Sequence, residues 1–255
     1  MARFVLVHGA FHGAWCWEPL QAALESGGHS VRTFDLPGSG EDETSVAEVT
    51  LDAYVGRICA VLAEEPEPVV LVAHSMGGVP MTQALRNCPD KIARAIYVAA
   101  FLPGDGQSLV DLTQLPEGEG DMVQAHMQVD GAPPVATLPA DVIPEAFYGE
   151  CTAEQAAWAT ERVRPQALAP FVTRVELGRD ERFAAARPPR AYVVATKDRA
   201  LPTALQRRLV GDNPGMDVVE IESDHSPFLS RTAELAAALA TLAERDQAAG
   251  SAPVK

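Results

Sequence analysis

The sequence predicts an α/β fold in which a mostly parallel sheet is covered by helices on both faces. Short apolar runs typical of buried strands alternate with helical patterns at both ends of the chain. The interval from residue 103 to 189 lacks this alternation. A chain of 255 residues can form one such domain undivided. We therefore expect a core from residues 1–102 and 190–246, a cap or lid inserted at 103–189, and a disordered tail at 247–255.

The first part of the chain predicts four strands, each a short β-branched or aliphatic run. We expect these strands at 4–8, 30–34, 69–73 and 95–99. Helical spacing of apolar residues predicts helices at 17–24 and 51–62, and a third that ends near residue 87. Because strand and helix alternate, neighbouring strands should run parallel.

The alternation resumes near the C-terminus, where two more strands are expected at 191–195 and 217–221 and two helices at 202–209 and 232–244. Between the two halves, prolines and glycines interrupt short helical pieces such as 153–163. An interval this long is unusual for a plain loop, so a helical cap is the expected structure. The sheet should therefore have about six strands.

Composition argues against several kinds of partner. The formal net charge of −15 would repel nucleic acids and anionic membranes, and it favours solubility. The apolar run at residues 4–7 is too short for a signal peptide or a membrane span. Four scattered cysteines, Cys16, Cys59, Cys88 and Cys151, form no C-x-x-C pair and suit reduced thiols better than disulfides or a zinc site. We expect a cytoplasmic protein with no nucleic-acid or membrane partner. The sequence does not predict its oligomeric state.

Ser75 is the expected nucleophile. It follows the apolar run 69–73 and precedes Gly77, Gly78 and a helical pattern. A nucleophile elbow of the form G-x-S-x-G requires such a strand, tight turn and helix, with small residues around the serine. Here Ala73, not a glycine, occupies the first small position of the motif, and its side chain is still small. An ordinary glycine-containing turn is the alternative interpretation.

Two further strand ends supply the partners that a serine nucleophile requires. Asp198 follows the strand at 191–195, and His225 follows the strand at 217–221. The order Ser, Asp, His is the one found in α/β-hydrolases. An imidazole accepts the serine proton, and a carboxylate orients that imidazole and stabilises its charged form. Asp224 is the competing acid, but a residue adjacent to His225 seldom turns back to meet its ring.

The turn after the first strand predicts an oxyanion hole. His8, Gly9 and Ala10 lie where a backbone amide can point above Ser75. In α/β-hydrolases this amide acts together with that of the residue after the nucleophile, which here are the amides of Ala10 and Met76. For His8 and His12, structural hydrogen bonding near the turn is favoured over catalysis.

Several segments together resemble the α/β-hydrolase group of plant methylesterases and hydroxynitrile lyases and their bacterial esterase relatives. The segments are Val5–Trp17, Asp35–Gly38, the elbow Ala73–Gly78, Asp198 with Leu201-Pro202, and Asp224-His225, with a weaker match in the cap at Val163–Pro165. The resemblance implies an α/β-hydrolase fold and a serine hydrolase for a small methyl or aryl ester, without cofactor or metal. It places the triad at Ser75, Asp198 and His225 and the oxyanion amides at Ala10 and Met76. Residues suggested for the pocket wall are Phe11, His12, Leu102, Trp158 and Phe171.

Two other classes remain open. The same triad serves carbon-carbon bond lyases of the hydroxynitrile lyase type, and the same fold can act as a ligand receptor with little turnover. The resembling lyases have a threonine after the first-strand histidine and a lysine after the catalytic histidine, whereas this chain has Gly9 and Ser226. A receptor would be indicated by a damaged triad, and none is visible. The acyl and alcohol groups of the substrate depend on the cap, whose motifs are unspecific.

Overall fold

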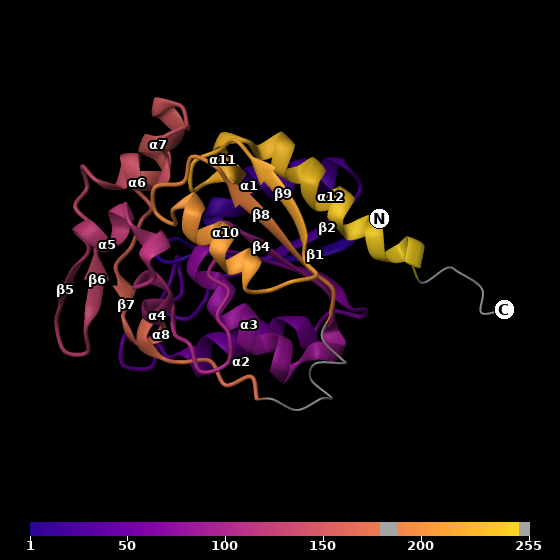
Figure 1. Cartoon of the computed structure of the whole chain (residues 1–255), viewed down its shortest axis with the longest axis horizontal. Helices are drawn as coiled ribbons and strands as arrows, with labels where there is room; N and C mark the ends of the chain where they lie inside the picture. Colours follow the sequence, from indigo (N-terminus) through magenta and orange to yellow (C-terminus); the bar gives the residue numbers. More distant parts are fainter. Residues whose placement is uncertain (179–187, 250–255) are drawn as a thin grey trace.

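A six-stranded parallel sheet forms the centre of the molecule (Figure 1). The structure is a computed structural model and describes residues 1–178 and 188–249. The strands lie in the order β2 (Ser30–Thr33), β1 (Arg3–Val7), β3 (Val69–His74), β4 (Ile92–Val98), β8 (Arg190–Ala195) and β9 (Asp217–Ile221). All five neighbouring pairs are parallel. The prediction of a parallel sheet with about six strands is confirmed.

The apolar runs form strands because the sheet buries both of its faces. Val5 pairs with Leu71, and both side chains join the core on one face. Phe4 and Val70, one residue earlier in each strand, pair with each other and join the core on the opposite face. Alternate side chains of a strand point to opposite faces, so a strand buried on both sides must be apolar throughout.

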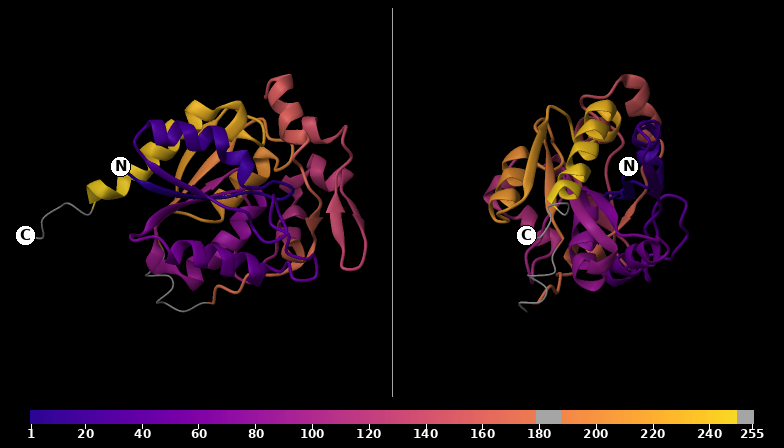
Figure 2. Two further views of the ribbon diagram at one scale, coloured as in Figure 1. Left: turned by 180° about the vertical axis from the view of Figure 1, so that it is seen from behind. Right: turned by 90° about the vertical axis from the view of Figure 1, so that its right-hand side faces the viewer.

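Helices cover the sheet in two layers (Figure 2). One face is covered by α1 (Glu18–Ser26), α11 (Pro227–Ser230) and α12 (Thr232–Ala249), and the other by α2 (Leu51–Ala63), α3 (Gly78–Asn87) and α10 (Thr203–Gly211). Short 3₁₀ turns are η1 (Ala14–Trp17), η2 (Ser75–Gly77), η3 (Pro89–Lys91) and η4 (Pro116–Gly118). Helix α12 extends to Ala249, beyond the expected start of the tail at residue 247, and residues 250–255 lie outside the described part. No helix within the described residues is long and apolar enough to cross a membrane.

The segment between β4 and β8 contains helices and a small antiparallel sheet of its own. Its helices are α4 (Leu109–Thr113), α5 (Met122–His126), α6 (Ile143–Phe147), α7 (Ala153–Thr160) and α8 (Ala169–Val172), and its strands are β5 (Gln128–Asp130), β6 (Val135–Thr137) and β7 (Gln166–Ala167). The expected cap helices are present, and the small sheet was not expected. Strands of two or three residues have no readable alternation, and β6 pairs with β7 across some thirty residues that include α6 and α7. Residues 179–187 of the expected cap lie outside the described part.

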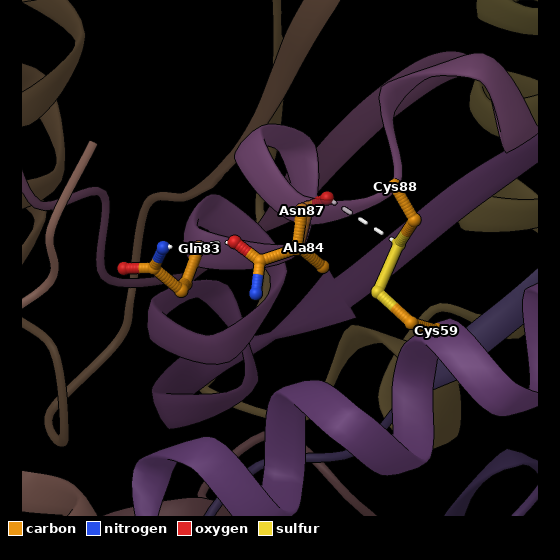
Figure 3. Close-up of a disulfide and its surroundings, with 5 residues drawn as sticks. All are labelled: Cys59, Gln83, Ala84, Asn87 and Cys88. Carbon is orange, nitrogen blue, oxygen red and sulfur yellow. Dashed lines mark hydrogen bonds between the residues drawn. A yellow bond between two sulfur atoms is a disulfide. The ribbon is translucent and has the colours of Figure 1, made fainter. Parts of the chain in front are cut away.

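Cys59 and Cys88 form a disulfide that joins α2 to the end of α3 (Figure 3). The expectation that all four cysteines are reduced is wrong for this pair. Their Cα atoms lie 6.0 Å apart because the two helices pack on the same face of the sheet, and their sequence separation of 29 conceals this proximity. Cys16 and Cys151 are free.

Candidate active site

Ser75 occupies a strained turn between β3 and α3. Its φ angle is 52°, a left-handed conformation that is rare for residues other than glycine. The turn is possible because two glycines follow. A Cβ added at Gly77 would lie 2.5 Å from the His8 carbonyl oxygen, and one at Gly78 would overlap the Phe101 carbonyl. The elbow therefore packs directly against the ends of β1 and β4, and Ala73 is fully buried within β3.

His225 and Asp198 form a buried pair at the ends of the neighbouring strands β9 and β8. His225 Nδ1 donates a hydrogen bond to Asp198 Oδ2 over 2.7 Å, and neither side chain is more than 2% exposed. The other carboxylate oxygen accepts the amides of Ala200 and Leu201, each at 2.8 Å. These bonds fix the position of the carboxylate. Because His225 holds its proton on Nδ1 in the bond to Asp198, its Nε2 atom is left as the acceptor.

Two residues that the sequence analysis did not single out support this pair. Gln206, on α10, donates from Nε2 to Asp198 Oδ2 over 3.0 Å and also bonds the backbone of Ala195. His74 donates from Nε2 to the His225 carbonyl oxygen over 2.8 Å, and the two rings are 4.5 Å apart. Burial lowers the pKa of His74 well below its usual value, and the neighbouring His225 and His12 lower it further. The His74 ring is therefore neutral beside His225.

Asp224 points away from the His225 ring. Its Oδ2 accepts the Glu150 amide at 2.9 Å and the Cys151 thiol at 3.5 Å, and its Oδ1 accepts the Ser226 amide and the Ser230 hydroxyl. The carboxylate thus ties the segment that follows α6 to the loop that contains His225. No signal in the sequence indicates this contact, because Glu150 and Asp224 are 74 residues apart.

The two amides expected to form the oxyanion hole belong to peptide units whose carbonyl groups accept hydrogen bonds. The Gly9 carbonyl, in the same peptide unit as the Ala10 amide, accepts His8 Nδ1 at 2.8 Å. The Ser75 carbonyl, in the same unit as the Met76 amide, accepts the Phe101 amide at 3.0 Å. A trans peptide directs its N–H opposite to its C=O, so each bond fixes the direction of its amide. Ala10 and Met76 line the same pocket as Ser75 and His225.

His8 and His12 make structural hydrogen bonds, as expected. His8 Nε2 accepts the Leu36 amide, which links the turn to the segment after β2. His12 Nδ1 donates to the Ala10 carbonyl, and its Nε2 accepts the Tyr148 hydroxyl. Burial lowers the pKa of His12 to about 3, so the ring is neutral at physiological pH.

A small pocket of about 60 Å³ lies between the elbow and the segment that follows β4. It is lined mostly by apolar side chains, with a few polar ones. The lining residues are Ala10, Phe11, Ser75, Met76, Phe101, Leu109, Val110, Thr113, Asp121, Val123, Gln124, Met127, Phe147, Phe171, Ala200 and His225. Ser75 and His225 both lie in this wall, but no hydrogen bond joins their side chains among the described residues; such bonds are often long in ligand-free sites.

The pocket contains two of the five wall residues suggested by the sequence, Phe11 and Phe171. The other three lie elsewhere. His12 is directed to Tyr148, Leu102 belongs to the hydrophobic core, and Trp158 makes an edge-to-face contact with Trp15 and lies under the Arg162 guanidinium. Most of the remaining wall comes from α4, α5 and α6, where no motif indicated a pocket.

The parallel sheet with polar groups at its strand ends is typical of a class of hydrolytic enzymes, and comparison with known proteins identifies the family. Residues 4–238 match the family described as "Alpha/beta hydrolase family". The chain therefore belongs to the α/β-hydrolase family.

Curated relatives of this chain include plant proteins. "Methylesterase 7" of Arabidopsis thaliana is 34% identical, with 95% of this chain and 96% of that protein covered. "Salicylic acid-binding protein 2" of Nicotiana tabacum is 32% identical, with coverage of 95% and 97%.

Solved structures are similar over almost the whole chain. A pyrethroid hydrolase from Sphingobium faniae superposes with a TM-score of 0.86 at 26% identity and covers 97% of this chain and 99% of its own. A methylesterase from Arabidopsis superposes with a TM-score of 0.80 at 30% identity, with coverage of 94% and 98%.

Proposed function

We propose that this protein, a carboxylic ester hydrolase, cleaves small esters by acyl transfer through Ser75, His225 and Asp198. The observation on which the proposal rests is the buried 2.7 Å bond between His225 Nδ1 and Asp198 Oδ2, beside a serine in a strained elbow. His225 Nε2 accepts the Ser75 proton as the hydroxyl attacks the ester carbonyl, and then returns it to the leaving alcohol. Water repeats the two steps and releases the acid.

The amides of Ala10 and Met76 are proposed to bind the oxyanion of the tetrahedral intermediate. Each donor is expected to contribute about 3 to 4 kcal/mol to stabilisation of the transition state. His8 and the Phe101 amide support this role because they fix the two peptide units without occupying the N–H groups. The reaction needs no group beyond these side chains, the two amides and water.

The substrate is proposed to be a small methyl or aryl ester. The relatives named as methylesterases support a methyl ester. A pocket of about 60 Å³ with apolar walls suits a short acyl or alcohol group. A cytoplasmic location stays a prediction, and the disulfide between Cys59 and Cys88 removes reduced cysteines as one of its supports.

Two positions favour ester hydrolysis over cyanohydrin cleavage. Ser226 is neutral and cannot stabilise a cyanide anion as a positively charged side chain would. Gly9 has no hydroxyl, and an added Cβ would lie 2.8 Å from both His74 Nδ1 and Ser75 Cβ. The site therefore has no room for the threonine that the resembling lyases have at this position.

The proposal is tested with the purified protein on a panel of methyl, aryl and lactone esters together with mandelonitrile. We expect hydrolysis of at least one small ester and no cyanide release above the uncatalysed background. Ser75→Ala should lower kcat by about 10⁴-fold or more while the circular dichroism spectrum is unchanged. A phosphonate inhibitor should add its mass to the peptide that contains Ser75. Residual activity within about tenfold of wild type in the alanine variant would exclude Ser75 as the nucleophile, and cyanide release faster than every ester would exclude the esterase assignment.

A further inference from the structure

Asp121 is an acidic residue in the wall of the substrate pocket that the proposed mechanism does not use. It lies just before α5, is 6% exposed, and shares the pocket with Ser75 and His225. Two backbone bonds hold it in place. Its amide donates to the Gly118 carbonyl at 3.1 Å, and the next amide, of Met122, donates to the Arg199 carbonyl at 2.9 Å. Arg199 follows Asp198, so Asp121 is anchored to the loop that orients His225.

Helix capping accounts for a polar residue at position 121 but not for an acid. Asp121 Oδ1 accepts the Gln124 amide at 2.8 Å, as an N-cap residue does. Asparagine or serine caps a helix about as well as aspartate, without placing a charge in an apolar pocket. In the parts of the chain that the structure describes, no side chain donates to the Asp121 carboxylate and no lysine or arginine pairs with it. The carboxylate therefore retains acceptor capacity toward the pocket.

The surroundings of Asp121 make this charge costly. Other residues in the wall of this pocket include Leu109, Val123, Met127 and Phe147, all apolar. Burial raises the pKa of the Asp121 carboxyl to about 6; the Gln124 and Val123 amides and His225 oppose the shift, and Asp198 adds to it. At neutral pH the Asp121 carboxylate is thus ionised, and the protein supplies too few hydrogen-bond donors and no positively charged side chain to offset its burial within the described residues. A ligand that donates hydrogen bonds or carries positive charge would supply them.

We propose that Asp121 determines substrate specificity by favouring esters that carry an ammonium or another hydrogen-bond donor and by disfavouring esters that carry a carboxylate. The inference rests on the proposed function, because it concerns the same pocket. A donor on the substrate replaces the water that the carboxylate loses on burial, whereas a second carboxylate meets like charge without a counter-ion. The same repulsion acts on the acid product and favours its release.

The test uses three methyl esters of similar length: β-alanine methyl ester with an ammonium, methyl butanoate with a methyl group, and monomethyl succinate with a carboxylate. At pH 7.5 the wild type should prefer the ammonium ester over the neutral ester and reject the anionic one. Asp121→Asn retains the N-cap oxygen and removes the charge. It should reduce the ratio of kcat/KM between the ammonium and anionic esters by about 10-fold or more, mostly through KM. At pH 5, where the wild-type carboxyl is largely protonated, the wild-type ratio should move toward that of the variant.

Asp141→Asn is the matched control, because Asp141 is an exposed acid in the same segment and the substitution changes net charge equally. It should leave the ratio unchanged. Asp121→Ser is a second variant that also keeps a capping oxygen, should Asp121→Asn fold poorly. Equal ratios in the wild type and in a folded Asp121 variant would overturn the proposal while esterase activity stands.

Binding of unreactive ligands separates this proposal from the function on which it rests. Calorimetric titration with butylamine and with butanoate should show a preference for the amine that Asp121→Asn abolishes. If no ester is hydrolysed but this preference is found, the proposed function fails and the role of Asp121 stands. If wild type and Asp121→Asn bind butylamine and butanoate with the same relative affinity, the role of Asp121 is excluded.

Discussion

At the scale of single residues, the two acids close to His225, Asp198 and Asp224, make different contacts. Asp198 bonds the His225 ring, whereas Asp224 bonds the Glu150 amide, the Cys151 thiol, the Ser226 amide and the Ser230 hydroxyl. The contact with His225 bears on the proposed chemistry, whereas the bonds from Glu150 and Cys151 join the inserted segment to the core. Substitution should therefore separate the effects of the two acids on activity and on stability.

Asp198→Asn should lower kcat by about 10⁴-fold, because an amide group favours the wrong tautomer of His225. Its NH₂ group also faces the buried Gln206 Nε2 donor, so some stability is lost as well. Asp224→Asn should lower the free energy of unfolding by about 1 to 3 kcal/mol with a smaller loss of kcat, since its NH₂ group must face buried donors that do not belong to the His225 ring. Steady-state kinetics and urea unfolding of both variants test this difference. A larger loss of kcat in folded Asp224→Asn than in Asp198→Asn would show that the triad acid has been wrongly assigned.

Gly9 is a second residue at which a close contact limits the site. An added Cβ would meet His74 Nδ1 and Ser75 Cβ, each at 2.8 Å. We expect Gly9→Ala to destabilise the protein by about 1 to 3 kcal/mol and to lower kcat, because the elbow or His74 must move. Gly56, in α2, is the control: a Cβ there meets nothing within 4 Å, so Gly56→Ala should be neutral or stabilising by up to about 1 kcal/mol. Thermal unfolding and ester hydrolysis are the measurements, and equal behaviour of the two variants would contradict the crowding argument.

At the scale of elements, α2 and α3 are joined both by packing and by the disulfide between Cys59 and Cys88. Cys88 follows the last residue of α3, the helix that begins just after the Ser75 turn, and its Sγ also contacts the Ala84 carbonyl at 3.4 Å (Figure 3). The cross-link encloses β3 and the elbow in one covalent loop. It therefore constrains the unfolded chain around the part that supplies Ser75.

Reduction of this disulfide should lower the free energy of unfolding by about 3 to 4 kcal/mol, the loop-closure value for a separation of 29 residues. Denaturant unfolding of the wild type with and without a reducing agent measures the effect. The double substitution of Cys59 and Cys88 by serine should unfold like the reduced wild type and should not respond to the reductant. An unchanged wild-type midpoint after complete reduction, verified by thiol counting, would refute this role.

At the scale of the whole molecule, Asp121 should couple stability to pH. Its pKa is about 6 in the folded protein against 3.8 for the ordinary group, so between these values the folded state retains a proton that the unfolded state has lost. Stability should fall as pH rises through this window, and the cost above pH 6 is about 3 kcal/mol. Below pH 4 both states are protonated and the cost disappears.

Asp121→Asn should consequently be more stable than the wild type at pH 7.5, by up to about 3 kcal/mol, and about equally stable at pH 4. Urea unfolding at the two pH values provides the measurement. Asp141→Asn should show no such pH-dependent difference. If Asp121→Asn is no more stable than the wild type at pH 7.5, the carboxylate is better compensated than its surroundings indicate.

The core could be predicted because its signals are local. The run Val69–Val72 is apolar at every position since β3 is buried on both faces, and the glycines after Ser75 are required by contacts at the turn itself. Strands β1, β8 and β9 and helices α2 and α10 begin and end within about two residues of their expected limits for the same reason. The positions of Ser75, Asp198 and His225 follow from this pattern, because each lies at the carboxyl end of a predicted parallel strand.

What the sequence determined by itself is thus the parallel sheet, its helical layers and the three strand ends at which the proposed triad lies. The tertiary structure has Asp198 beside His225, as the sequence analysis expected, and it alone decided that Cys59 meets Cys88, that β6 pairs with β7, and that Asp121 lies in the pocket while Trp158 does not. Periodicity and turn chemistry act between residues a few positions apart and can be read along the chain. These other contacts join residues from 29 to 150 positions apart, and each depends on how separate elements pack, which no local pattern records.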